Sequence, residues 1–383
     1  MKRVYLDNAA TTPLAEEVFE EMAPYLKNMF GNPSSSHSFG REAKGLLETA
    51  RRKVARYLNA KPSEIIFTSG GTESDNMVFN IAIYQLNVER IITSSIEHHA
   101  VIHTVEDKSN TNKIEFDLVK LDKKGHVDLA HLEELLASSD KKTLVSLMHG
   151  NNEIGNLLPL EKVSKLCRKH NAHFHSDTVQ TMAHYRFDLQ ELDIDFITCS
   201  AHKFHGPKGI GFLYINSYIH AAPMIIGGSQ ERGLRAGTVN VHSVLGLAKA
   251  MEISYENLEA HQQHIQGLKS YMIKQLKEAI GDVYFHGDAT TPEKSLYTVL
   301  NVSLPKTSKD SMLLFTLDLK GVACSGGSAC SSGSEKGSHV LEGIQADTSR
   351  PNVRFSLSRY TTKDDIDFAV NVLKEVFEKE LVG

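Results

Sequence analysis

The sequence predicts an α/β protein with a mostly parallel sheet that is flanked by helices. Between residues 64 and 215, short apolar runs alternate with amphipathic segments, which is the pattern of repeated β-α units. Hydrophobic residues make up 41% of the 383 residues and charged residues 23%, and both values are ordinary for a globular enzyme. The length allows two domains, or one large domain with an appendage.

The expected elements follow in chain order. After a short strand near residue 5, apolar residues at helical spacing predict helices at 15–26 and 41–58. The alternating region is expected to hold strands at 64–68, 90–94, 113–121, 143–149, 172–176, 195–199 and 210–215. Helices are expected between them at 72–84, 98–105, 129–137 and 160–170. One long helix is expected over 241–280, then strands at 283–285, 298–303 and 354–357, and helices at 310–320 and 362–381.

The long helix is expected to bridge two domains. The first is a large domain over 13–255, and the second is a smaller α+β domain made of 1–12 and 256–383. The formal net charge of −5 argues against direct nucleic-acid binding. No apolar run is long enough for a membrane span or a signal peptide, so no membrane association and a cytoplasmic location are expected.

The four cysteines fall into two groups. Cys167, Cys199 and Cys324 lie in apolar patterns and are expected to be small core residues. Cys330 lies in the segment 325–334, where every neighbour is small or polar. This composition predicts an accessible loop and a reactive thiol.

A lysine marks the segment around which the chain is organised. Lys203 lies in a Gly-rich stretch, 200–211, between two apolar runs that are expected to be strands. A lysine desolvated in such a place can become an amine nucleophile. Taken alone, a solvated surface lysine is the more common explanation.

Two further motifs change that balance. The turn Gly70-Gly71-Thr72 joins a strand to a helix, and a helix N-terminus with exposed N–H groups favours an anion such as phosphate. Asp177 follows a strand at the edge where open α/β sheets bind ligands. A lysine, a phosphate turn and a strand-end acid together match the needs of pyridoxal phosphate, whose ring nitrogen an acid keeps protonated.

Other candidates are less specific. His98 follows another strand end, where an imidazole can stack on a cofactor ring and move protons. His99 and His103 have the spacing of a metal pair, but no third ligand is evident, so no metal is expected. Arg354 can bind a substrate carboxylate through paired hydrogen bonds, with a surface ion pair as the alternative.

These motifs resemble those of a known family. The chain is similar, nearly from end to end, to cysteine desulfurases of the NifS and IscS type, which are pyridoxal-phosphate enzymes of the class V aminotransferase superfamily with fold type I. The resemblance is carried by seven segments: 5–13, 31–35, 67–76, 151–155, 200–211, 231–238 and the loop around Cys330. It implies a large cofactor-binding domain with a seven-stranded type of sheet. Gly326 stands where many relatives have serine.

The resemblance also implies roles for individual residues. Lys203 is expected to attach the cofactor, His98 to stack on its ring and Cys330 to accept sulfur. The other residues expected at the cofactor are Gly71, Thr72, Asn152, Asp177, Gln180, Ser200 and His202, with Thr238 reaching the phosphate from the partner subunit of a homodimer. Arg354 and Asn32 are expected to bind the substrate.

The implied reaction converts L-cysteine to L-alanine and leaves the sulfur as a persulfide on Cys330. An acceptor protein, either an iron–sulfur scaffold or a tRNA-thiolation enzyme, is expected to receive it. A selenocysteine lyase or an aminotransferase on the same scaffold is the alternative. A non-enzymatic sulfur-relay scaffold would have no need of Lys203 and Asp177, and both are present.

Overall fold

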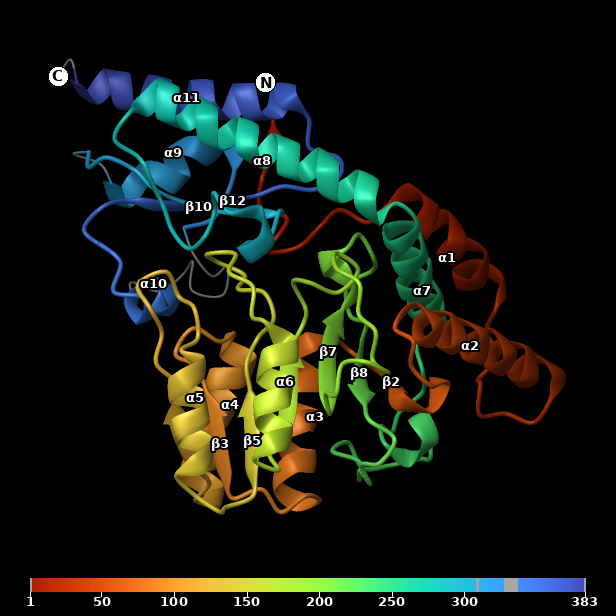
Figure 1. The fold of residues 1–383 in the computed structure, drawn as a ribbon. Coiled ribbons are helices and arrows are strands. Elements are labelled where there is room, and N and C mark those ends of the chain that lie inside the picture. Colours follow the sequence, from red (N-terminus) through yellow and green to blue (C-terminus); the bar gives the residue numbers. More distant parts are fainter. Residues whose placement is uncertain (1, 308–309, 327–336, 382–383) are drawn as a thin grey trace.

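A seven-stranded sheet organises the larger part of the molecule (Figure 1). The computed structural model describes residues 2–307, 310–326 and 337–381. The strand order is β2-β8-β7-β6-β5-β3-β4, and β8 alone runs antiparallel to its neighbours. This confirms the predicted mostly parallel sheet. The strands are β2 (Ile65–Thr68), β3 (Arg90–Thr93), β4 (Glu115–Leu118), β5 (Thr143–Ser146), β6 (His173–Asp177), β7 (Phe196–Ser200) and β8 (Gly211–Ile215).

Helices cover both faces of this sheet. Neighbouring residues of each strand point to opposite faces, and both sets are apolar, so both faces have to be covered. In β5, Leu144 packs with the apolar residues of α3 and α4, whereas Val145 packs with those of α5 and α6. In Figure 1, α5 and α6 lie in front of the sheet, and α3 and α4 lie behind it. The helices are α3 (Gly71–Tyr84), α4 (His99–Asn112), α5 (Leu129–Ala137) and α6 (Leu160–Lys169).

The long helix predicted over 241–280 is wrong in one respect, because it is two helices. They are α7 (Val241–Glu256) and α8 (Leu258–Ile280), and they meet at Asn257, whose backbone has φ −115° and ψ 19°. The helix α7 packs on α1 (Glu16–Asn28) and α2 (Ser38–Tyr57), whereas α8 packs on α11 (Lys363–Leu381) (Figure 1). The apolar stripe therefore changes partner at the break, and periodicity continues across it.

A second group of elements lies on the far side of that break. Its antiparallel sheet has the order β12-β10-β9, formed by β9 (Tyr284–Phe285), β10 (Val299–Ser303) and β12 (Asn352–Ser356). The N-terminal β1 (Val4–Tyr5) joins this part by parallel pairing with β11 (Val322–Ala323). Two further helices are α9 (Leu313–Leu319) and α10 (His339–Gly343). All of these elements except α10, which packs against Ile96 and Ile154, share a hydrophobic core of their own. The domain boundaries given above remain a prediction.

Among the described residues, the structure contains no helix that is both long enough and apolar enough to cross a bilayer.

Candidate active site

A cavity of about 240 Å³ lies at the carboxyl ends of the parallel strands, where open α/β sheets bind ligands. The ends of β6 and β7 contribute Asp177 and Ser200, and the segments after β3 and β5 contribute His98 and Met148. The cavity brings together residues far apart in sequence: Ala9, Ala10, Gly71, Thr72, Asp75, His98, Met148, Asn152, Asp177, Val179, Gln180, Ser200, His202, Lys203 and Arg354.

The amine of Lys203 projects toward the N-terminal segment. Lys203 ends a short 3-10 turn that follows β7, and its Nζ donates hydrogen bonds to the carbonyl oxygens of Ala9 (2.7 Å) and Ala10 (2.9 Å). The same segment also binds the neighbouring residue, because the N–H and the hydroxyl of Thr12 both donate to the His202 carbonyl at 2.9 Å. The first dozen residues therefore hold the lysine turn in place.

Asp177 is the buried acid of the cavity. One carboxylate oxygen accepts a hydrogen bond from the Val179 N–H at 2.8 Å. Burial, and then the charge of the nearby Asp75, raise the pKa of Asp177 to about 7. The side chain of Gln180 is fixed beside it, because its Nε2 donates to the Ala9 carbonyl at 3.0 Å.

His98 faces this acid from the start of α4. Its Nδ1 accepts a hydrogen bond from the Ala100 N–H at 3.1 Å and so caps the helix. Burial, and then the charge of Lys203, lower the pKa of His98 to about 4, so the imidazole is neutral near neutral pH. Because Nδ1 accepts, the proton of the neutral ring is on Nε2.

The residues that the sequence predicted to bind the cofactor phosphate lie together, because Gly71, Thr72, Ser200 and His202 line the same two adjoining cavities. Gly71 and Thr72 are the first residues of α3, so their backbone N–H groups lie at the helix N-terminus, where an anion is favoured. Ser200 and His202 line both the main cavity and an adjoining one that also includes Lys208. A Cβ at Gly71 would lie 2.8 Å from the Val179 side chain, so a larger residue here would require Val179 to move.

Arg354 is buried, with 1% of its surface exposed, and lies in the middle of β12 rather than near its start. Its guanidinium donates to the Asn152 carbonyl at 2.9 Å and to the Asp7 carboxylate at 2.8 Å. Its Nε has no hydrogen-bond partner among the described residues. A buried guanidinium with a spare donor beside a cavity can bind a carboxylate.

Three predicted site residues are not part of this cavity in the structure. Asn32 lies in the loop between α1 and α2, where its side chain accepts from the Ser34 N–H at 2.9 Å. Thr238 is exposed, and the cavity does not include it. Cys330 lies in 327–336, outside the described residues. The roles of all three remain predictions.

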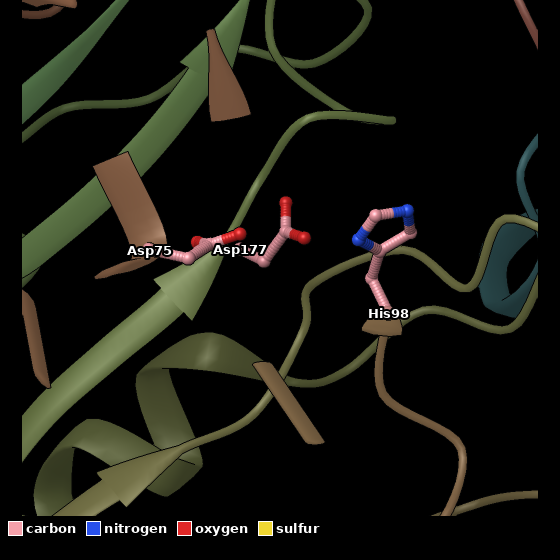
Figure 2. A group of neighbouring side chains, drawn as sticks. All are labelled: Asp75, His98 and Asp177. Atoms are coloured by element: carbon pink, nitrogen blue, oxygen red, sulfur yellow. The ribbon is translucent and has the colours of Figure 1, made fainter. Parts of the chain in front are cut away.

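Asp75, Met148 and the backbone of Ala9 and Ala10 are parts of the site that the sequence did not predict. Asp75 follows Thr72 by three residues, which is nearly one helical turn, and this spacing is the one signal that could have identified it. Figure 2 shows the Asp177 carboxyl group between Asp75 and His98. One carboxylate oxygen of each aspartate and one ring nitrogen of His98 all lie within 4.8 Å of one another.

These residues fit pyridoxal phosphate. The cofactor needs a lysine amine, an acid for its ring nitrogen and an anion site for its phosphate. Lys203, the buried Asp177 and the start of α3 at Gly71 face one cavity and supply all three.

Comparison with known proteins agrees with this geometry. The family model for aminotransferase class-V matches residues 4–368. A protein named cysteine desulfurase IscS from Dictyoglomus turgidum is 43% identical over 386 residues, which covers 99% of this chain and 96% of that protein. A solved NifS-like protein superposes with a TM-score of 0.89 at 37% identity and covers 98% of this chain and 99% of its own. A structure titled SspA in complex with cysteine has a TM-score of 0.79 at 30% identity, and covers 94% and 100%.

The chain therefore belongs to the class V aminotransferase family, whose members use pyridoxal phosphate. Within this family it is a cysteine desulfurase, as its relatives are.

Proposed function

We propose that Cys330 accepts the sulfur of L-cysteine as a persulfide and that L-alanine is released. The observation that carries the proposal is the meeting of Lys203, Asp177 and the buried Arg354 in one cavity. The Cys330 thiolate attacks the substrate sulfur, an S–S bond forms, and the C–S bond breaks with its electron pair left on carbon. Protonation of that carbon completes alanine, so that a thiol and cysteine become a persulfide and alanine.

The described residues on either side of 327–336 support this role of Cys330. On the N-terminal side, Ser325 pairs with Arg354 by two backbone hydrogen bonds. On the C-terminal side, Ser338 donates to the Glu153 carboxylate at 2.5 Å, and His339 donates to the Glu97 carbonyl at 2.9 Å. Cys330 is five residues from Ser325, and an extended chain spans at most about 17–18 Å over five residues. Because Ser325 pairs with Arg354, which lines the cavity, the chain from Ser325 to Cys330 is long enough for Cys330 to serve this cavity.

Each residue of the cavity has a proposed task. Bound pyridoxal phosphate supplies an electron sink for the reacting carbon. Lys203 binds it and then moves the Cα proton, Asp177 holds the ring nitrogen, and Arg354 orients the substrate carboxylate. His98 would lie against the ring and, because its proton is on Nε2, would donate a hydrogen bond to the substrate sulfur. The remaining contacts of the cofactor are assigned to Gly71, Thr72, Asn152, Gln180, Ser200 and His202.

We also propose that the chain forms a homodimer in the cytoplasm and delivers sulfur to an acceptor protein, either an iron–sulfur scaffold or a tRNA-thiolation enzyme. The exposed position of Thr238 supports the dimer, because a residue that serves the partner's phosphate site has to face outward. Asn32 is proposed to contact the substrate.

The test is incubation of the protein with L-cysteine, followed by mass spectrometry of the Cys330 peptide. One added sulfur that a thiol reductant removes is the expected result. Cys330→Ser should lose alanine formation, whereas Cys324→Ser, a matched control in the same part of the chain, should retain it. Full alanine production by Cys330→Ser would contradict the role of Cys330 and favour a selenocysteine lyase, whereas an aminotransferase would form a keto acid and no alanine from cysteine.

A further inference from the structure

A second buried acid lies beside the acid proposed to hold the ring nitrogen. Asp75 lies in the second turn of α3 with 1% of its surface exposed, and Asp177 ends β6 with 5% exposed. Oxygen atoms of the two carboxyl groups lie within 4.8 Å of each other (Figure 2). Two carboxylates this close in a buried site do not both ionise readily, because each charge opposes the other and burial opposes both.

The hydrogen bonds of the two acids differ. Asp177 accepts from the Val179 N–H at 2.8 Å, and an N–H donor stabilises the ionised form. Asp75 Oδ1 has no hydrogen-bond partner among the described residues, and His175 Nε2 lies 3.5 Å from it. A buried oxygen that accepts nothing is well placed to carry a proton.

We propose that Asp75 and Asp177 share one proton, and that Asp75 Oδ1 carries it toward His175 Nε2 while Asp177 remains the anion. This rests on the proposed role of Asp177 at the ring nitrogen and extends it. Asp75 is then a positioning residue, because it acts through Asp177. If Asp75 lost its proton to solvent, the buried site would hold two negative charges that repel each other. If the proton moved to Asp177 instead, Asp177 would be neutral.

The surrounding groups are consistent with this arrangement. Burial raises the pKa of Asp75 to about 7, and the Thr198 hydroxyl opposes that rise. Burial lowers the pKa of His175 to about 4, so its ring is neutral. When Nδ1 donates to the Ser146 hydroxyl at 2.8 Å, Nε2 is an acceptor that faces both the Thr198 hydroxyl at 3.1 Å and Asp75 Oδ1 at 3.5 Å. The titratable groups that face the pair are Glu97, His98, His175 and Lys203.

The first test is a double-mutant cycle on the cofactor-free full chain. The unfolding constants of the wild type, Asp75→Asn, Asp177→Asn and the double variant are compared at about pH 5 and about pH 8. Coupling between the two sites should be near zero at the lower pH, where both acids are protonated. For each single variant, we compare the ratio of the wild-type unfolding constant to that of the variant. This ratio should be about tenfold larger at the higher pH than at the lower pH. Asp140→Asn, an exposed control, should show no coupling with Asp177→Asn at either pH.

Infrared spectroscopy identifies which acid carries the proton, and it serves if a variant is too unstable for the cycle. At neutral pH, the carbonyl band of a protonated acid should weaken in Asp75→Asn and persist in Asp177→Asn, with a constant contribution from Glu97. Coupling that does not change with pH, or the opposite pattern of bands, would overturn the proposal. Neither measurement involves the cofactor, so both stand even if Asp177 does not hold the ring nitrogen.

Discussion

Ser325 and Arg354 exchange two backbone hydrogen bonds, one from the Arg354 N–H at 2.6 Å and one from the Ser325 N–H at 3.2 Å. This pairing connects the segment that leads to Cys330 directly to the strand that carries the proposed carboxylate-binding residue. The proposed substrate-binding residue and the start of the proposed sulfur-accepting segment are thereby held together by one backbone pairing.

Replacement of Arg354 by lysine should weaken the binding of L-cysteine. A lysine keeps the charge but cannot contact a carboxylate with two parallel N–H groups. A charge-assisted hydrogen bond contributes about 1.5–3 kcal/mol, so the KM for L-cysteine should rise about tenfold or more. Alanine formation measured against cysteine concentration gives the value. Arg350→Lys, four residues earlier and outside the cavity, should leave KM unchanged, and an equal change in both variants would contradict the assignment.

Thiol alkylation of the native protein should modify Cys330 well before the three described cysteines. Cys167 and Cys199 are buried, and burial raises the pKa of both thiols, so little thiolate is available to react. Burial also raises the pKa of Cys324 to about 12. Peptide mass spectrometry after a short exposure to iodoacetamide measures the order of modification. Faster labelling of Cys324 than of Cys330 would contradict the expectation that the Cys330 thiol is accessible.

The buried ion pair between Arg51 and Glu231 should be important for stability. Two hydrogen bonds of 2.8 Å join their side chains, and Glu231 also accepts from the Phe67 N–H at 2.8 Å. Arg51→Leu leaves a buried carboxylate without its partner, so the free energy of unfolding should fall by about 3–5 kcal/mol. Addition of Glu231→Gln should recover part of that loss in urea unfolding. Additive losses in the double variant would show that the two side chains act independently.

Stability should rise with pH through the titration of Lys269. Its Nζ is buried and donates to the Ser295 hydroxyl at 2.8 Å and the Leu296 carbonyl at 2.7 Å. Burial lowers the pKa of Lys269 to about 7, whereas an unfolded lysine titrates near about 10.4. Between these values the unfolded chain binds more protons, so folding is favoured as pH increases.

The variant Lys269→Met isolates this contribution. Its stability relative to the wild type should be greatest below about pH 7 and should decline toward about pH 10. The reason is that the free energy of unfolding of the wild type rises over this range through Lys269, whereas the variant has no amine to titrate. Thermal unfolding across this range measures the difference. A difference that does not vary with pH would show that the amine has an ordinary pKa.

Local patterns in the sequence determined the element types and much of the site. Repeated apolar runs indicated the parallel sheet, and strand ends and Gly-rich turns indicated Gly71, Asp177 and Lys203, because such ligand positions follow from local chain geometry. The helix break at Asn257 escaped prediction, since a change of packing partner does not interrupt a 3.6-residue periodicity.

Tertiary structure alone decided the contacts between distant segments. The hydrogen bonds from Lys203 to the carbonyl oxygens of Ala9 and Ala10 join residues that are more than 190 positions apart in sequence. The short distance between Asp75 and Asp177 depends on how α3 packs against β6. No local pattern encodes such pairings, because they arise only when the buried surfaces of separate elements come together. The sequence by itself thus singled out Asp177 and Lys203, and the fold determined which groups lie beside them.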